Sequence, residues 1–144
     1  MSKLPMDEIY VAIVNEIAKL SYSERSKVAA ILIKDDAIIS YGYNGMPKGM
    51  SNKCEWKSGE TKLEVIHAEI NCIAKVAKST YSSNNAIMYC SYSPCIECAK
   101  VIIQAGIKCV KYIHLYRLQN GLELLWLNDI ETKQIVINEK AETE

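Results

Sequence analysis

The chain has 144 residues, of which 49% are hydrophobic and 24% charged, an ordinary globular composition that argues against disorder. This length supports one hydrophobic core, so we expect a single domain over 1–144, with frayed ends at 1–4 and 139–144. The formal net charge is zero, and without a basic stripe we expect no stable nucleic-acid partner.

The first residues are polar and interrupted by Pro5, which does not fit a secretory signal peptide. The longest apolar runs are too short to span a membrane, so we expect no membrane partner. The chain has six cysteines. Without a secretory signal, metal binding or burial is favoured over disulfide formation. Cys72, Cys90 and Cys109 lie in apolar segments, where packing is their default role.

The first third of the chain predicts a helix followed by a β-hairpin. After Pro5, apolar residues recur at helical spacing over 6–20. Two apolar runs, 28–34 and 37–43, flank a short acidic turn, which is typical of a hairpin. A loop over 42–49 then holds three glycines and a proline, which indicates either a simple turn or a backbone that closely approaches a ligand. Irregular chain is expected from 50 to 62.

A second helical period runs from Leu63 to Ala77 and contains His67 and Glu69. These two side chains lie about 200° apart around an ideal helix, so they do not project together from a regular one. They can still serve one site if they lie near a helix start that faces a pocket. Taken alone, His67 would be read as a core histidine.

The remaining elements alternate between strands and helices. We expect a strand over 86–91, a helix from Pro94 to a cap at Gly106, a strand over 108–116, a short helix over 122–127 and a strand over 134–138. Strand–helix–strand alternation implies right-handed crossovers. The sequence therefore predicts an α/β fold, a three-layer α-β-α sandwich around a mixed five-stranded sheet.

Three side chains, His67, Cys95 and Cys98, can bind one metal ion. The two cysteines are three apart, so they share one face of a helix start, where the helix dipole favours thiolates. Three protein ligands leave a tetrahedral zinc one open position, at which the pKa of a water falls to roughly 7. Glu69 is not needed as a ligand and can carry protons, whereas Glu97 is read as a solvated helix residue.

Neither half of this motif is specific when it stands alone. A lone Cys-x-x-Cys is often a structural zinc half-site or a redox pair, and a lone His-x-Glu carries little information. Together, with Pro94 before the first cysteine, they match the signature of zinc-dependent base deaminases.

At these residues the chain resembles the zinc-dependent cytidine deaminase superfamily, and most closely its viral and bacterial deoxycytidylate (dCMP) deaminases. The resemblance covers roughly residues 20–130 and rests on Gly42-Tyr43-Asn44-Gly45, His67-Ala68-Glu69-Ile70-Asn71, Ser93-Pro94-Cys95, Cys98-Ala99-Lys100 and the segment 102–107. It implies the cytidine-deaminase-like fold and the zinc-dependent hydrolysis of dCMP to dUMP and ammonia, a supply route for dTTP precursors.

The resemblance also implies roles for individual residues. His67, Cys95 and Cys98 would hold one catalytic Zn²⁺, and Glu69 would shuttle protons. Substrate contacts are expected from Asn44 to the sugar, from the Ala68 backbone to the pyrimidine, from Ser93 and Pro94 beside the base, and from Tyr116 as an aromatic wall. For the 5′-phosphate, the nearest hydroxyl and cations are those of Ser23, Arg25 and Lys27.

Regulation and assembly are further implications of the resemblance. Members of the family are usually homohexamers, often activated by dCTP and inhibited by dTTP with Mg²⁺. The effector site would involve Gly42, Tyr43, Gly45, Pro47 and Gly49. The expected location is the cytoplasm, that of the host for a viral member. We expect no second, structural zinc, because His114 is predicted inside a strand and Cys54 stands alone in its loop.

Four alternatives remain open at this point. The protein could deaminate both dCMP and dCTP, or it could act on nucleosides and need no phosphate pocket. A tRNA adenosine deaminase would be expected to have a basic surface, and the zero net charge disfavours such a surface. A zinc-stabilised binding module without catalysis would need the open position filled, and no fourth ligand lies near the motif.

Overall fold

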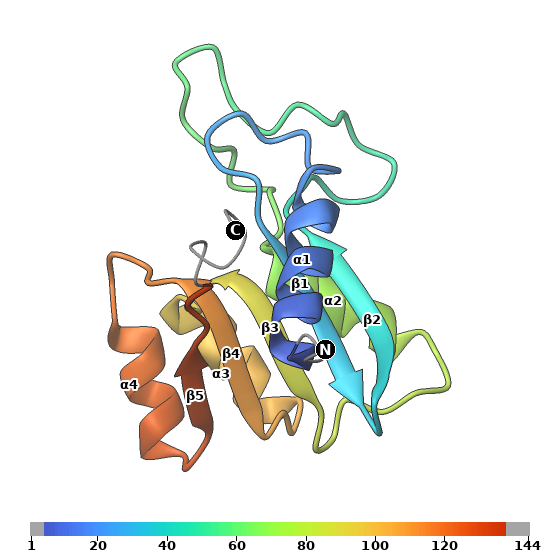
Figure 1. Ribbon diagram of the computed structural model, residues 1–144. Coiled ribbons are helices and arrows are strands. Elements are labelled where there is room, and N and C mark those ends of the chain that lie inside the picture. Colours follow the sequence, from blue (N-terminus) through green and yellow to red (C-terminus); the bar gives the residue numbers. More distant parts are fainter. Residues whose placement is uncertain (1–4, 138–144) are drawn as a thin grey trace, which may run out of the picture.

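The computed structural model describes residues 5–137 (Figure 1), so the ends that we expected to be frayed, 1–4 and 139–144, lie outside the described residues. The elements follow the order that the sequence predicts. They are α1 (Met6–Ala18), β1 (Ala29–Lys34), β2 (Ala37–Tyr43), α2 (Ala68–Ala77), β3 (Ile87–Tyr92), α3 (Ile96–Gln104), β4 (Cys109–His114), α4 (Asn120–Leu127) and β5 (Glu131–Gln134).

The five strands form one mixed sheet in the order β2-β1-β3-β4-β5. Strand β1 is antiparallel to both β2 and β3, while β3, β4 and β5 are parallel. The hairpin between β1 and β2 turns at Asp35 and Asp36, whose φ angles are 50° and 63°. A two-residue turn with positive φ at both positions matches the twist of the strands, and aspartate tolerates this conformation.

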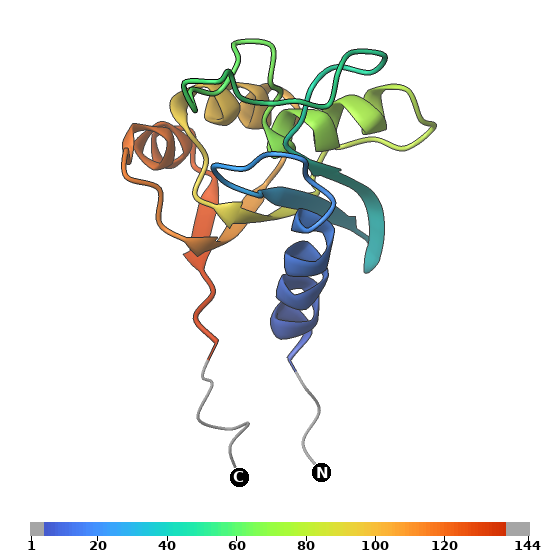
Figure 2. The ribbon, with the colours of Figure 1, turned by 90° about the horizontal axis from the view of Figure 1, so that it is seen from above.

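Helices cover both faces of the sheet, which confirms the predicted three layers. Helix α1 lies on one face, and α2, α3 and α4 lie on the other (Figure 2). Alternate residues of β1 point to opposite faces. One set packs with Tyr10 and Val14 of α1, namely Ala29, Ile31 and Ile33. The other set, Ala30 and Leu32, belongs to the larger core that includes residues of α2, α3 and α4.

Two predicted boundaries are wrong. The helix expected from Leu63 begins only at Ala68, because Ile66 forms an isolated antiparallel bridge with Gly45 and Leu63 is 99% exposed. The strand expected over 134–138 lies instead at Glu131–Gln134. This strand is at the edge of the sheet and largely exposed, so it lacks the apolar pattern that marks buried strands. Asn138 lies outside the described residues.

Close backbone packing places the start of α2 on the sheet. Gly42 of β2 is buried, and a Cβ there would lie 2.5 Å from the Cys72 nitrogen and 2.7 Å from the Ala68 oxygen. Only glycine permits this approach. Gly106 has a φ of +78° and ends α3 as predicted.

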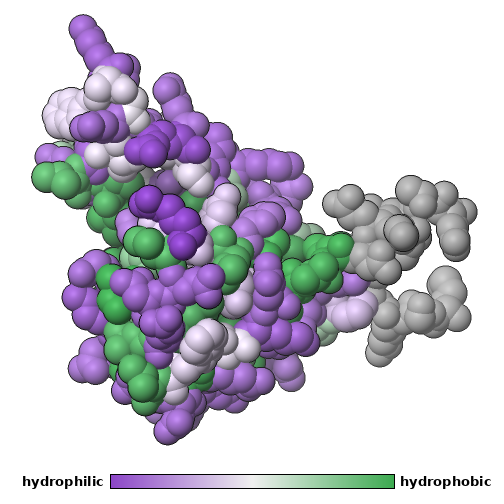
Figure 3. Space-filling model, turned by 90° about the vertical axis from the view of Figure 1, so that its left-hand side faces the viewer, coloured by the Kyte–Doolittle hydropathy of each residue, from purple (hydrophilic) through white to green (hydrophobic). Residues whose placement is uncertain are grey.

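Two long connections, 19–28 and 44–67, lie side by side beyond the edge of the sheet at which β1 starts and β2 ends (Figure 1). In the space-filling view this upper part of the molecule is mainly hydrophilic, whereas separate hydrophobic patches occupy the body below it (Figure 3). Among the residues described, no helix has the length and apolarity needed to cross a membrane.

Candidate active site

The starts of α2 and α3 bring His67, Cys95 and Cys98 together. His67 and Cys95 each occupy the position just before a helix, in extended conformation. Their carbonyl oxygens accept the first helical hydrogen bonds, from the Asn71 and Ala99 nitrogens at 3.0 and 2.9 Å. Cys98 lies in the first turn of α3. Because His67 precedes its helix, the direction of its side chain does not follow helical spacing.

The three ligand atoms form a compact cluster. His67 Nδ1 lies 3.2 Å from Cys98 Sγ and 3.4 Å from Cys95 Sγ, and all three atoms lie within 4.8 Å of one another. Tetrahedral zinc, with bonds of about 2.0–2.1 Å to nitrogen and about 2.3 Å to sulfur, places such atoms roughly 3.5 Å apart. The donor set therefore fits zinc. Across residues 5–137 it is the only group of three or more such side chains.

The two cysteines of the cluster differ in their protonation. The hydrogen bond from the Cys98 thiol, with the nearby His67, lowers the pKa of Cys95 to about 4 against the opposing effect of burial. The same pairing with Cys95, together with burial, raises the pKa of Cys98. The hydrogen bond to Cys95 raises the pKa of His67. Cys95 is thus a thiolate at neutral pH, the form that binds metals.

Glu69 is the second residue of α2 and is only 6% exposed, although it lines the pocket beside the cluster. Burial raises the pKa of its carboxyl group, and the charge of His67 opposes that effect. Glu97, the other carboxylate near the motif, is exposed on α3 and pairs with Lys100 at 2.8 Å. The interpretation of Glu97 as a solvated helix residue is therefore confirmed.

The cluster opens into a pocket of about 750 Å³, a size typical of small-molecule sites. Most of the residues predicted for the site line it: His67, Ala68, Glu69, Cys95, Asn44, Ser93, Tyr116, Ser23 and Arg25. Pro94 and Cys98 are buried and are not part of its lining. Ser93 is held rigidly, because its hydroxyl accepts a hydrogen bond from the Tyr116 nitrogen at 2.7 Å and its own nitrogen donates to the His114 oxygen at 2.9 Å.

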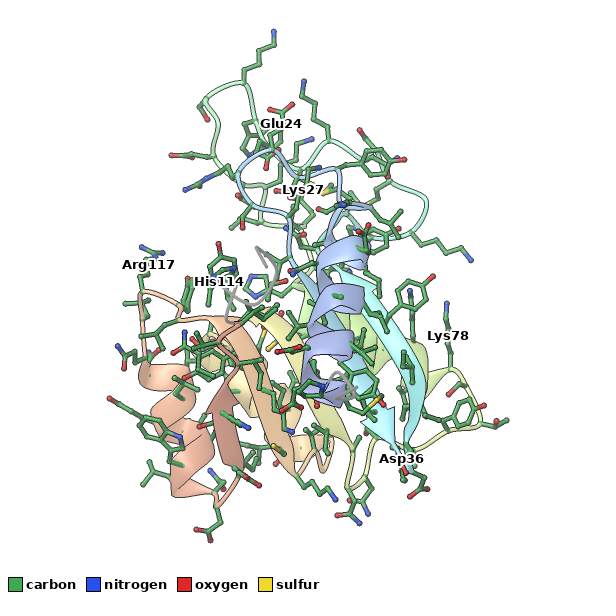
Figure 4. All side chains as sticks on the ribbon, in the orientation of Figure 1. Glu24, Lys27, Asp36, Lys78, His114 and Arg117 are labelled. Carbon is green, nitrogen blue, oxygen red and sulfur yellow. The ribbon has the colours of Figure 1, made fainter. Side chains whose placement is uncertain are left out.

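One wall of the pocket is polar and cationic. It is formed by the segment that carries Ser23 and Arg25 and by the end of the 44–67 connection, with Thr61 and Lys62. Arg117, which follows β4, contributes a further cation and points towards the upper loops (Figure 4). The sequence prediction missed Lys62 and Arg117, because nothing local marks a cation in a polar loop as facing a site.

Lys27 was predicted to bind phosphate, but the structure does not bring it to the pocket lining. Its ammonium group instead donates to the Ser21 carbonyl. The Ser23 hydroxyl is also engaged within the protein, since it donates to Glu55 Oε2 at 2.9 Å. Of the two predicted cations, only Arg25 therefore lines the pocket.

The Gly42–Gly49 segment divides into parts with different roles. Gly42 and Tyr43 belong to β2, and of the whole segment only Asn44 lines the pocket. The Asn44 amide donates to the Ser26 oxygen at 2.8 Å and accepts from the Val28 nitrogen at 3.0 Å. Asn44 thus braces the wall that carries Arg25. The need for glycine at position 42 is explained by packing against α2, and a role in effector binding stays a prediction.

The cysteines outside the cluster are buried, as expected for Cys72, Cys90 and Cys109. Cys54 is also buried, although it lies in the 44–67 connection. Its carbonyl accepts a hydrogen bond from the Lys62 nitrogen at 2.8 Å, so this residue anchors a short hairpin at the edge of the pocket.

Known proteins share both the sequence pattern and the fold. Residues 5–114 match the family described as "Cytidine and deoxycytidylate deaminase zinc-binding region". A human deoxycytidylate deaminase is 38% identical over 113 residues, which cover 73% of this chain, and the chain spans only 62% of that relative's length. A deoxycytidylate deaminase of Mycobacterium phage D29 is 31% identical over 126 residues, which cover 78% of this chain and 97% of the phage protein.

Among solved structures, the chain is similar to the dCMP deaminase from cyanophage S-TIM5, crystallised in complex with dCMP and dUMP. The match has a TM-score of 0.89 and 36% identity, and it covers 94% of this chain and 100% of the phage chain.

Proposed function

Because the chain belongs to the cytidine and deoxycytidylate deaminase zinc-binding family, we propose that it hydrolyses dCMP to dUMP and ammonia. The observation that carries this proposal is a His/Cys/Cys cluster beside a buried glutamate in a pocket whose wall also carries cations. Such a pocket can bind a pyrimidine ring beside the cluster and a phosphate at the cationic wall. The complex of the cyanophage enzyme with dCMP and dUMP supports the choice of nucleotide.

His67, Cys95 and Cys98 would hold the zinc ion. When bound, zinc supplies Lewis acidity and lowers the pKa of water to roughly 7. Glu69 accepts a proton from the attacking water while the water oxygen bonds to C4 of cytosine. Glu69 delivers that proton to N3. Glu69 then transfers the second proton of the water to the amino group. The C4–N bond breaks, ammonia leaves and uracil remains.

The pocket residues would orient the nucleotide for this reaction. We assign the Ala68 backbone and Ser93 to the base, Tyr116 to an aromatic wall, and Asn44 to the side of the sugar. Pro94 contributes by shaping the turn that presents Ser93 and Cys95. Arg25, with Arg117 and Lys62 on the same pocket, would attract the 5′-phosphate, because guanidinium groups bind phosphate oxygens in pairs.

We further propose, on the family resemblance alone, that the protein is a homohexamer that dCTP activates and that dTTP with Mg²⁺ inhibits. Mass measurement in solution tests the assembly, and assays with each triphosphate test the regulation. An unchanged rate with both effectors would contradict this part without affecting the proposed reaction. The cytoplasmic location also stays a prediction.

The reaction is tested by comparing the turnover of dCMP, dCTP, deoxycytidine and CMP. Turnover is measured by ammonia release and by loss of cytosine absorbance. We expect dCMP to be the preferred substrate and a zinc chelator to abolish turnover. Comparable turnover of dCTP would indicate a bifunctional enzyme, and a preference for deoxycytidine would indicate a nucleoside deaminase. No turnover of any of them, in protein that contains one zinc per chain, would favour a tRNA adenosine deaminase or a binding module.

A further inference from the structure

Glu55 is a buried acid that has no role in the proposed reaction. It lies in the 44–67 connection and is 5% exposed. Its Oε2 atom accepts three hydrogen bonds, from the Ser23 hydroxyl at 2.9 Å and from the Glu24 and Arg25 nitrogens at 3.1 and 3.3 Å. Burial alone would raise the pKa of Glu55, but these hydrogen bonds outweigh it and lower that pKa. An ionised carboxylate is therefore held inside the protein.

The hydrogen bonds of Glu55 join the two segments that form the polar wall of the pocket. Glu55 and Thr61 form an antiparallel bridge, and the Trp56 nitrogen donates to the Glu60 oxygen at 2.9 Å, so that 54–62 folds back as a short hairpin. This hairpin brings Thr61 and Lys62 to the pocket lining. Glu55 fastens it to the neighbouring segment, which carries Ser23 and Arg25, and the two segments lie together above the sheet (Figure 1).

Arg25 is the cation whose backbone this arrangement holds. Glu55 binds the backbone nitrogen of Arg25 and not its guanidinium group, and within residues 5–137 no carboxylate forms an ion pair with that group. The other two cations of the pocket are partly engaged. The Lys62 ammonium lies 4.8 Å from the centroid of the Trp56 ring, and the Arg117 guanidinium lies 5.6 Å from that of Tyr116.

A fixed backbone with an unpaired guanidinium favours anion binding, because the backbone of Arg25 is already ordered and no ion pair has to be broken. The carboxylate orders this segment through backbone and hydroxyl donors, all on Oε2, and within residues 5–137 it forms no ion pair with the Arg25 guanidinium. The same three donors would rearrange if Glu55 were removed, because buried groups do not stay without partners.

We propose that Glu55 is a positioning residue that determines selectivity for the phosphorylated substrate over the nucleoside, by holding Arg25 at the polar wall. This inference rests on the proposed function, because the phosphate is that of the nucleotide. Glu55 itself does not line the pocket, so its effect would be exerted through Arg25.

The experiment uses the zinc-loaded full chain with Glu55→Ala, Glu55→Gln and Arg25→Ala, and with Glu60→Gln as the matched control. Glu60 is an exposed acid on the same hairpin. We expect Glu55→Ala to raise the KM for dCMP about tenfold, the equivalent of one charge-assisted hydrogen bond. The kcat for dCMP, and the kcat/KM for deoxycytidine, should stay within about twofold of the wild-type values. Glu55→Gln should show a smaller loss, because the amide oxygen still accepts hydrogen bonds.

The double variant distinguishes positioning from general support of the fold. If Glu55 acts through Arg25, Glu55→Ala combined with Arg25→Ala should lose no more than Arg25→Ala alone. Additive losses, or equal losses with dCMP and deoxycytidine, would overturn the inference. If Glu55→Ala does not fold, as judged by its melting curve, the same comparison is made with Glu55→Gln.

A binding measurement separates this inference from the proposed function. The affinities for dUMP and deoxyuridine are measured by calorimetry in each variant. If the wild type does not deaminate dCMP but Glu55→Ala still weakens the binding of dUMP and not that of deoxyuridine, the proposed reaction is wrong and the positioning role stands. If the wild type binds dUMP no better than deoxyuridine, the positioning role is wrong.

Discussion

Replacement of Gly121 by alanine tests how the fold supports the metal ligands. Gly121 is a buried residue near the start of α4, which packs on the chain that leads into α3. A Cβ at this position would lie 2.0 Å from the Pro94 oxygen and 2.8 Å from the Cys95 carbonyl carbon. Its φ is not in the left-handed region, so the conflict is steric and not conformational. The atoms that would have to move belong to the backbone of a zinc ligand.

The size of the effect follows from these distances. Ordinary contact begins at 3.4 Å, so the two backbones must separate by about 1.4 Å (3.4 − 2.0 Å). Either α4 withdraws from the core that contains Leu122 and Leu125, or Cys95 shifts away from His67. Overpacking of this kind costs about 1–3 kcal/mol, which lowers the melting temperature by roughly 3–12 °C in a chain of this size. A displaced ligand should weaken zinc binding by roughly tenfold or more.

Two assays are needed, thermal unfolding of the zinc-loaded protein and the rate of zinc release to a chromogenic chelator. Gly45→Ala is the matched control, because a Cβ at Gly45 meets no atom within 4 Å. Equal melting temperatures and equal rates of zinc release in Gly121→Ala and Gly45→Ala would show that the close contact at Gly121 does not constrain Cys95.

Three further predictions address the catalytic glutamate, the metal and the docking of α1. Glu69→Gln should retain one zinc but lose roughly 10²–10⁴-fold in kcat with dCMP, whereas Glu97→Gln, on the exposed side of α3, should keep its activity; near-normal turnover of zinc-loaded Glu69→Gln would disprove the assignment. Removal of zinc by a chelator should lower the melting temperature, because metal that binds only the folded chain stabilises it, and an unchanged melting curve would mean that the cluster holds no metal. Asp7 accepts hydrogen bonds from Tyr89 and from Lys111 (3.0 Å), which lower its pKa although burial opposes them. The stabilisation by Asp7 is therefore complete above the unfolded pKa of about 3.9 and is lost as the pH falls through the folded pKa. Asp7→Asn should melt at a lower temperature than the wild type at pH 7 and at nearly the same temperature in strong acid. A difference in melting temperature that persists in strong acid would contradict this account.

The order of the elements, the three layers and the metal cluster can all be predicted from the sequence. Helical and strand periodicities are local properties, so α1 and the β1–β2 hairpin follow from them directly. The cluster of His67, Cys95 and Cys98 is also predictable, because His-x-Glu followed by Pro-Cys-x-x-Cys is a specific combination of residue types and both short motifs are visible in the chain. The role of Glu97 follows from its place on the outer face of a helix.

The start of α2 and the choice of polar residues that face the pocket depend on contacts between distant segments. The apolar residues Leu63 and Ile66 continue a helical period, but Ile66 is held in extended conformation by Gly45, which lies far from it in sequence. Lys27 and Arg25 cannot be distinguished by their neighbours in the chain. They differ because the Lys27 ammonium finds the Ser21 carbonyl, while Glu55, thirty positions away from Arg25 in the sequence, holds that residue by its backbone. Such contacts join distant segments, and local sequence patterns carry no information about them.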